Sequence, residues 1–200
     1  KTKYYFRFAN KLWNAARFIN MKVFGEEDQK VNIDLHSLAE DLSMNMDKLN
    51  HFDQWILQKI STLIADSERA FSQFQLGEYW HQIVQCLYAD FCDWYIEIAK
   101  RQKSEYTDKV LLYALGQQIQ LLHPFMPFVT EELWHGLTGT PDDVFIGRDD
   151  FITADEGKID DAAEAEFEFI QKIVEAARLL RSNGKLVPSK SADFIIRLKN

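Results

Sequence analysis

The chain has 200 residues, of which 46% are hydrophobic and 27% charged, as expected for one globular domain or one domain with a small appendage. A chain of this length buries roughly 70% of its unfolded surface, so it needs no disulfide or metal to fold. The net charge of -8 argues against a protein that binds nucleic acid over its whole surface. No apolar run reaches the roughly 18 residues of a membrane span, and the two cysteines, Cys86 and Cys92, are predicted to be reduced thiols of a cytoplasmic protein.

The charges are distributed unevenly along the sequence. Residues 1–25 contain six lysines and arginines and no acid, whereas residues 142–168 contain eleven acids and only two cations. A local basic face can hold phosphates even when the net charge is negative. We therefore expect any nucleic-acid contact to involve the N-terminal segment, and the acidic stretch to be a solvated surface.

Apolar residues that recur at spacings of three and four predict a mainly helical chain. The pattern predicts helices over about 4–24, from Asp53 as N-cap to Gly77, from there to about 100, over 106–122, and a short one after Pro127. The polar segment 25–51 is predicted to hold one or two short helices, around 35–42 and 44–50. The first 138 residues therefore predict an antiparallel helical bundle.

The character of the sequence changes after residue 138. A loop rich in Gly, Pro and Asp leads to a short predicted strand at 144–146, a long helix at 160–182 that ends at Asn183 and Gly184, and a strand at 191–198. We expect residues 139–200 to form a small α/β appendage. The chain does not begin with Met and ends within a predicted strand, so we expect it to be part of a longer protein.

The first predicted helix has two distinct faces at about 100° per residue. Its apolar face is predicted to lie in the core and consists of Tyr5, Phe8, Leu12, Ala16, Ile19 and Val23. The opposite face consists of Arg7, Asn10, Lys11, Asn14, Arg17, Phe18 and Met21. Cations can bind phosphates, amides can bond base edges, and an aromatic ring can stack on an unpaired base. The alternative is a solvated face with Phe18 packed under segment 25–51.

The third predicted helix has one apolar residue outside its core stripe. That stripe consists of Trp80, Ile83, Val84, Leu87, Phe91, Trp94 and Ile98. Ile96 falls about 180° from the centre of the stripe near Leu87 and Phe91, and Lys100, Arg101 and Lys103 follow it. The pattern predicts an exposed Ile96 that forms the second wall of an RNA-binding groove. Isolated exposed apolar residues are also common without any function.

Four runs of residues resemble one family. Residues 10–18 (NKLWNAARF), 53–57 (DQWIL) and 91–97 (FCDWYIE) resemble the anticodon-binding domain of valyl-tRNA synthetases. Residues 123–134 (HPFMPFVTEELW) are similar to the segment that closes that bundle, a motif shared with the leucyl and isoleucyl enzymes. The agreement covers about residues 8–137, and residues 139–200 fit more loosely.

The resemblance implies a role in recognising the anticodon loop of a valine transfer RNA. It implies that Phe18 stacks on an anticodon base and that Ile96 lies near the same base. Arg7, Lys11 and Arg17 are then expected to hold phosphates, and Asn10 and Asn14 to contact a base or sugar. The expected partners are valine transfer RNA and the rest of a monomeric, cytoplasmic parent synthetase, with no membrane.

Some features depart from the family pattern. This chain has Phe6-Arg7 where the family usually has Arg-Asn. Residues 187–191 (VPSKS) faintly resemble a class I catalytic loop but lie after the bundle, and we interpret them as a turn. We expect no catalytic residue, metal or cofactor in this chain, with ATP and Mg²⁺ belonging to a catalytic domain elsewhere in the parent.

Three alternative functions remain open from the sequence. The first is the anticodon domain of an isoleucyl- or leucyl-type synthetase. The second is a helical protein-interaction module that uses the same aromatic face. The third is a di-iron bundle built from the pairs Glu78/His81 and Glu132/His135, although the wheels place these pairs away from the predicted core.

Overall fold

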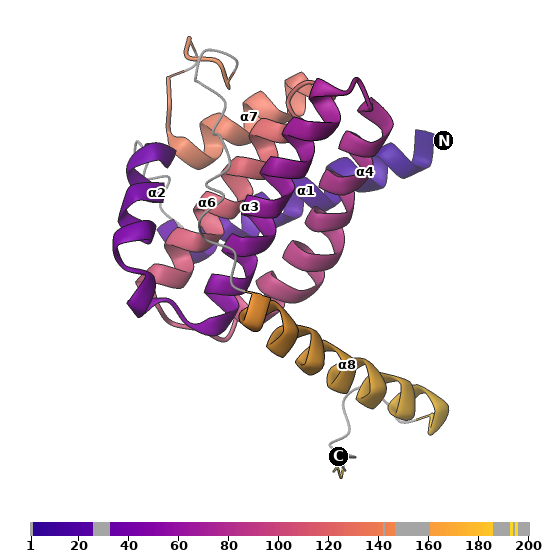
Figure 1. The fold of residues 1–200 in the computed structure, drawn as a ribbon. Helices are drawn as coiled ribbons and strands as arrows, with labels where there is room; N and C mark the ends of the chain where they lie inside the picture. The colour runs from indigo at the N-terminus through magenta and orange to yellow at the C-terminus, as the bar shows by residue number, and fades with distance from the viewer. Residues whose placement is uncertain are drawn as a thin grey trace. The chain divides into compact units, whose positions relative to one another are not determined.

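The computed structural model describes the backbone of residues 2–25, 33–141, 143–146, 161–185, 193 and 195. Side chains are described from residue 6 in the first range and from residue 167 in the fourth. The chain divides into two compact units, residues 1–159 and residues 160–200. The first unit is a helical bundle, as predicted (Figure 1).

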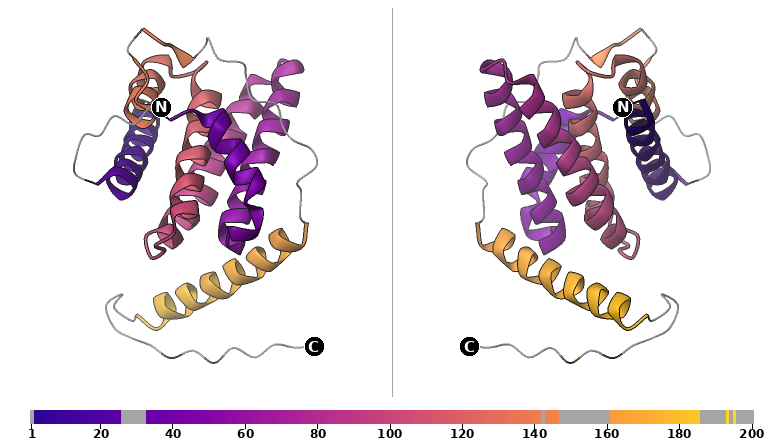
Figure 2. Two further views of the ribbon diagram at one scale, coloured as in Figure 1. Left: turned by 90° about the vertical axis from the view of Figure 1, so that its left-hand side faces the viewer. Right: turned by 90° about the vertical axis from the view of Figure 1, so that its right-hand side faces the viewer.

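The central element of the first unit is helix α6 (Glu105–Leu122), in which 13 of 18 residues are buried. Helices α2 (Leu35–Met44) and α3 (His51–Ser72) pack on it, and so do α1 (Thr2–Phe24) and α7 (Pro127–Thr138). Figure 2 shows α1 and α7 on one side of α6, with α2 and α3 on the other. The core lies between these helices, which explains why α6 is buried around most of its circumference. Gln117, Gln118 and Gln120 are buried there together with its apolar residues.

The packing of α2 against α6 depends on a close approach at Gly116. A Cβ added at Gly116 would lie 2.5 Å from Cδ1 of Leu35. Leu35 is the first residue of α2, and the carboxylate of Asp34 caps that helix by accepting hydrogen bonds from the backbone N–H groups of His36 and Ser37. The predicted short helices in segment 25–51 are confirmed as α2 and the 3₁₀ turn η1 (Met46–Lys48).

Helix α3 begins earlier than predicted. Its N-cap is Asn50, whose side chain accepts hydrogen bonds from the N–H groups of Phe52 and Asp53. Asp53 is the third helical residue and closes a capping box with Asn50, so the prediction that Asp53 is the N-cap was wrong. The turn after α3 centres on Phe74, which has φ of 57°, whereas Gly77 lies within the first turn of the next helix.

The helical rod from residue 76 to residue 99 has three parts. Helix α4 (Leu76–Gln85) continues into a π-helix, η2 (Cys86–Tyr95), and ends as α5 (Ile96–Ala99). The predicted core residues Ile83, Leu87 and Phe91 are fully buried. Beyond them the buried positions shift from the predicted Trp94 and Ile98 to Tyr95, Ile96 and Ala99.

The second unit contains helix α8 (Asp161–Asn183), which confirms the predicted long helix. The predicted strand at 144–146 does not form: residues 144 and 145 have no regular structure, and residue 146 lies in a 3₁₀ turn. The strand predicted at 191–198 lies outside the described residues, except for Asp193 and Ile195. The α/β character of residues 139–200 therefore stays a prediction. Within the described part of the chain, no helix is long and apolar enough to cross a membrane.

Candidate nucleic-acid interface

The outer face of α1 forms a continuous exposed stripe without an acidic residue. We call this set the α1 stripe: Phe6, Arg7, Asn10, Trp13, Asn14, Arg17 and Met21. Of the predicted apolar face, Phe8, Leu12, Ala16 and Ile19 are at most 3% exposed, whereas Val23 is half-buried and the side chain of Tyr5 lies outside the described residues. Within the described part of the chain, neither Arg7 nor Arg17 forms an ion pair. The stripe therefore presents positive charge that no described acid neutralises, together with amides that can bond bases or sugars.

Phe18 lies at the edge of the α1 stripe that faces α5. Its side chain is half-buried, and the ammonium of Lys100 lies 5.5 Å from the centroid of its ring. A half-exposed ring beside a cation can stack on an unpaired base while the cation approaches a phosphate. The ring of Phe18 on α1 therefore lies near Lys100 at the end of α5. The alternative that Phe18 packs under segment 25–51 stays a prediction, because residues 26–32 lie outside the described residues.

Lys11 occupies the same edge of α1 but has structural partners. Its ammonium pairs with the Asp93 carboxylate at 2.7 Å and lies 4.1 Å from the centroid of the Tyr88 ring. These contacts join α1 to η2. Lys11 is thus the one cation of the predicted set whose charge is already neutralised by a described residue.

Ile96 is not exposed, so that part of the sequence prediction was wrong. Its side chain is only 5% exposed, and it lies one helical turn before Lys100, on the same face of the rod. The helical wheel assumed an α-helix throughout. The π-helix between residues 86 and 95 has i→i+5 hydrogen bonds and turns less per residue. Over the nine residues from Leu87 to Ile96, this difference rotates Ile96 from the predicted outer face into the core.

The turn between α5 and α6 brings further positive charge to the edge of α1. We call residues 100–104 the basic turn, because it contains Lys100, Arg101 and Lys103, all exposed. The ammonium of Lys22, one turn along α1 from Phe18, lies 3.2 Å from the backbone oxygen of Gln102 in this turn. The basic turn therefore lies beside α1, at the edge that carries Phe18 and Lys22.

A buried polar network supports the start of α6 beneath the basic turn. The Tyr95 hydroxyl donates to Oδ1 of Asp53 at 2.7 Å, and the Thr107 hydroxyl donates to Oδ2 of Asp53 at 3.0 Å. The Asn50 amide donates to the same Oδ2 at 2.6 Å. Burial raises the pKa of Asp53 above its ordinary value, although these hydrogen bonds oppose the shift. Burial, together with the nearby Asp53 carboxylate, raises the pKa of Tyr95.

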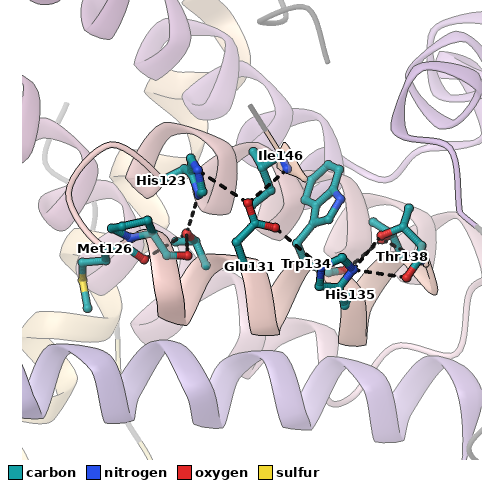
Figure 3. Close-up of polar contacts among 10 residues, drawn as sticks. His123, Met126, Glu131, Trp134, His135, Thr138 and Ile146 are labelled. Carbon is teal, nitrogen blue, oxygen red and sulfur yellow. Dashed lines mark hydrogen bonds and ion pairs between the residues drawn. The ribbon is translucent and has the colours of Figure 1, made fainter. Parts of the chain in front are cut away.

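A second polar cluster lies on α7 and has a structural arrangement. Figure 3 shows Glu131 between two histidines: its carboxylate oxygens lie 3.6 Å from Nε2 of His123 and 3.6 Å from Nε2 of His135. The backbone N–H of Ile146 donates to Glu131 at 3.2 Å, and Nδ1 of His135 lies 3.1 Å from the backbone oxygen of Thr140. These contacts tie the segment after α7 back onto the helix. His123 bonds Thr130 across the α6–α7 turn at 2.8 Å, as expected of a structural turn residue.

The groups considered for other chemistry are separated or inert. Glu78, His81 and Glu132 are exposed on α4 and α7, as the wheels predicted, and no described His, Cys, Asp and Glu side chains form a cluster able to hold a metal. Cys86 and Cys92 are free and buried. Burial raises the pKa of Cys92 to about 12 and that of Cys86 further. Such thiols are protonated and unreactive at neutral pH.

Sequence reasoning missed three contributors to this surface. Phe6 is 68% exposed and adds an aromatic side chain to the α1 stripe. So does Trp13, which is 46% exposed. It borders the apolar face of the wheel at about 100° from its centre, so the wheel alone gave little reason to select it. The basic turn was visible as a sequence cluster, but its position beside Phe18 depends on a contact between residues 82 positions apart.

Comparison with known proteins identifies the family of this chain. Residues 53–196 match the family model described as the anticodon-binding domain of tRNA ligase. This match covers more than half of the chain, so the chain belongs to the anticodon-binding domain family of tRNA ligases.

Within that family, the chain is similar to valine–tRNA ligases. It is 32% identical over 205 residues to the enzyme of Synechocystis sp., and 32% identical over 203 residues to that of Fusobacterium nucleatum. It is 30% identical over 197 residues to the enzyme of Enterococcus faecalis. These alignments cover 95–96% of this chain but 21% of each relative. The chain thus spans about a fifth of the length of the curated relatives that it matches.

Proposed function

We propose that this chain recognises the anticodon loop of a valine transfer RNA as part of a valine–tRNA ligase. The observation that carries the proposal is the acid-free α1 stripe with the half-exposed Phe18 ring beside Lys100. Net negative proteins repel RNA unless cations are concentrated on one surface, and α1 provides that concentration. Membership of the anticodon-binding family and similarity to valine–tRNA ligases support the identity of the RNA.

Each residue of the interface is proposed to act according to its exposure and partners. Arg7 and Arg17 contact phosphates, because no described acid neutralises them. Asn10 and Asn14 bond a base or sugar, since both are exposed on the same stripe. Phe18 stacks on a splayed anticodon base. Lys11 contributes chiefly by bracing α1 against η2.

Ile96 takes no direct part in the proposed base contact, because it is buried. We propose that Lys100, whose ammonium lies near the Phe18 ring, replaces Ile96 as the second wall of the base-binding groove. Activation of valine and its transfer to RNA require residues beyond this chain, since the matched family is a binding domain. We assign those steps to the remainder of a longer ligase.

The proposal is tested by titrating the chain with a fluorescent anticodon stem-loop of valine transfer RNA. Phe18→Ala is expected to weaken binding by about 1–3 kcal/mol, which is roughly 5- to 150-fold. The matched control is Phe128→Ala, because the Phe128 ring is 90% exposed on α7; its binding is expected to stay unchanged. A stem-loop altered at the middle anticodon base should bind more weakly.

Two outcomes would contradict the proposal. One is equal affinity for the valine stem-loop and for a stem-loop with an unrelated anticodon. The other is a Phe18→Ala variant that folds normally and binds as tightly as the unaltered chain. Circular dichroism melting of each variant separates a loss of contact from a loss of folding.

A further inference from the structure

The basic turn carries two cations whose charge no described residue neutralises. Neither Arg101 nor Lys103 forms an ion pair with any residue that the structure describes, and both are exposed. Lys100, in contrast, pairs with Glu97 at 2.5 Å. A single exposed cation is ordinarily just a solvated surface residue. Whether positive charge is concentrated at the turn therefore depends on the acidic residues around it.

The described acids close to the turn, either in sequence or through hydrogen bonds, are paired with lysines or buried in the core. Asp108 pairs with Lys22 at 2.6 Å, and Glu105 pairs with Lys109 at 2.7 Å. Asp53 is buried and accepts hydrogen bonds from hydroxyl and amide groups. Among the described residues, therefore, no acid competes with phosphate for the charges of Arg101 and Lys103.

The basic turn is also held in a defined position against α1. The Lys22 ammonium bonds both the backbone oxygen of Gln102, at 3.2 Å, and the Asp108 carboxylate, at 2.6 Å. Lys22 belongs to α1, Gln102 to the turn and Asp108 to α6, so one side chain connects three elements. The Lys22–Asp108 pair is mostly shielded from solvent, with side-chain exposures of 15% and 27%.

The side chain of Gln102 fixes the turn from inside. Its Oε1 lies 3.0 Å from the Thr107 hydroxyl and accepts a hydrogen bond of 3.1 Å from the Asn50 amide. Asn50 is the N-cap of α3, so the turn is joined to α3, α6 and α1 at once. A turn fixed on three sides presents its cations with little loss of conformational freedom on binding.

We propose that the basic turn is a second RNA-backbone site, in which Arg101 and Lys103 contact phosphates while Phe18 holds a base. Lys22 is a positioning residue, because it holds the turn at the edge of the α1 stripe without reaching the RNA itself. This inference rests on the proposed function, since the RNA that enters the turn is the one bound at α1. The phosphates belong to the same stem-loop, as the adjacency of Lys100 and Phe18 requires.

The test measures stem-loop binding against salt concentration for Arg101→Gln and Lys103→Gln. Each phosphate contact contributes roughly 0.7–0.9 to the slope of log affinity against log salt, so each variant should lower the slope by about that amount. Affinity at low salt should fall several-fold. The control is Arg69→Gln, because Arg69 pairs with Asp66 and lies 19 residues along α3 from Asn50, which is about 28 Å along the helix axis. Its slope should stay unchanged.

The positioning role of Lys22 is tested by a double-mutant cycle, which measures whether replacing Lys22 changes the effect of Arg101→Gln on RNA binding. Lys22→Met should weaken RNA binding, and Arg101→Gln should then cost less affinity than it does in the unaltered chain, because the turn is no longer held. Lys22→Arg should restore the coupling, since arginine can still bond Asp108 and the turn. A structural role alone would lower the melting temperature without changing the effect of Arg101→Gln.

The outcomes separate this inference from the proposed function. If the unaltered chain does not discriminate the valine stem-loop, both fail. If Phe18→Ala weakens binding but Arg101→Gln and Lys103→Gln behave like Arg69→Gln, the basic turn is not an RNA site and only this inference fails. If those two variants act as expected but Lys22→Met leaves their effect unchanged, the assignment to Lys22 is wrong.

Discussion

The hydroxyl of Tyr95 donates a hydrogen bond of 2.7 Å to the carboxylate of Asp53. Both residues are fully buried. Tyr95 is the last residue of the π-helix, and Asp53 lies in the first turn of α3. The bond therefore fixes the point at which the rod formed by α4, η2 and α5 meets the end of the bundle that carries the basic turn.

Replacing Tyr95 with Phe is expected to lower the free energy of unfolding by about 1–3 kcal/mol, because a buried carboxylate oxygen loses a hydrogen-bond donor. Urea denaturation measures the change. The control is Tyr106→Phe, since the Tyr106 hydroxyl bonds the exposed Lys48 at 2.9 Å and water can replace it; its effect should be small. Equal effects of the two substitutions would show that the buried bond has no special importance.

Burial raises the pKa of Asp53 above its ordinary 3.8, which gives stability a defined dependence on pH. Between 3.8 and the raised pKa, the folded state binds more protons than the unfolded state, so this group's contribution to stability falls as pH rises through that window. The difference in unfolding free energy between the unaltered chain and Asp53→Asn should therefore decrease with pH there. Denaturation at a series of pH values measures this difference, and an increase with pH would contradict the assignment.

Ile96→Ala is expected to lower the free energy of unfolding by about 2–5 kcal/mol, because it opens a cavity in the core. Its effect on RNA binding should be small when binding is measured below the melting temperature. Ile195→Ala is the control, since Ile195 is 87% exposed. A stable Ile96→Ala variant that binds RNA weakly would contradict this prediction and support the helical-wheel prediction that Ile96 is exposed and contacts RNA.

Lys11 and Arg17 are expected to differ although both are cations of α1. Arg17→Gln should lower the slope of log affinity against log salt by roughly 0.7–0.9, as loss of one phosphate contact requires. Lys11→Gln should change the slope less but reduce thermal stability more, because it breaks the bridge to Asp93 and Tyr88. Equal slope changes would mean that the Asp93 pair opens when RNA binds.

The local sequence pattern was sufficient to predict the buried and exposed faces of a helix that is α-helical throughout. The spacing of Phe8, Leu12 and Ile19 predicted the buried face of α1 and hence the exposed face that carries Arg7, Asn10 and Arg17. The same reasoning predicted α6 and α8, because side-chain direction in a regular helix follows from residue number alone. The charge asymmetry of residues 1–25 was likewise a property of sequence.

The tertiary structure decided two features that the spacing of apolar residues could not predict: the burial of Ile96 and the pairing of the cations on α1. A π-helix at residues 86–95 changes the turn per residue, so Ile96 moved into the core although its identity and spacing suggested the surface. Likewise, the sequence gives no reason to distinguish Lys11 from Arg17, since both are cations on the polar face of α1. Folding places Asp93 beside Lys11, whereas no described acid pairs with Arg17. Partners far apart in sequence determine which charges remain available, and those partners meet only when the helices pack.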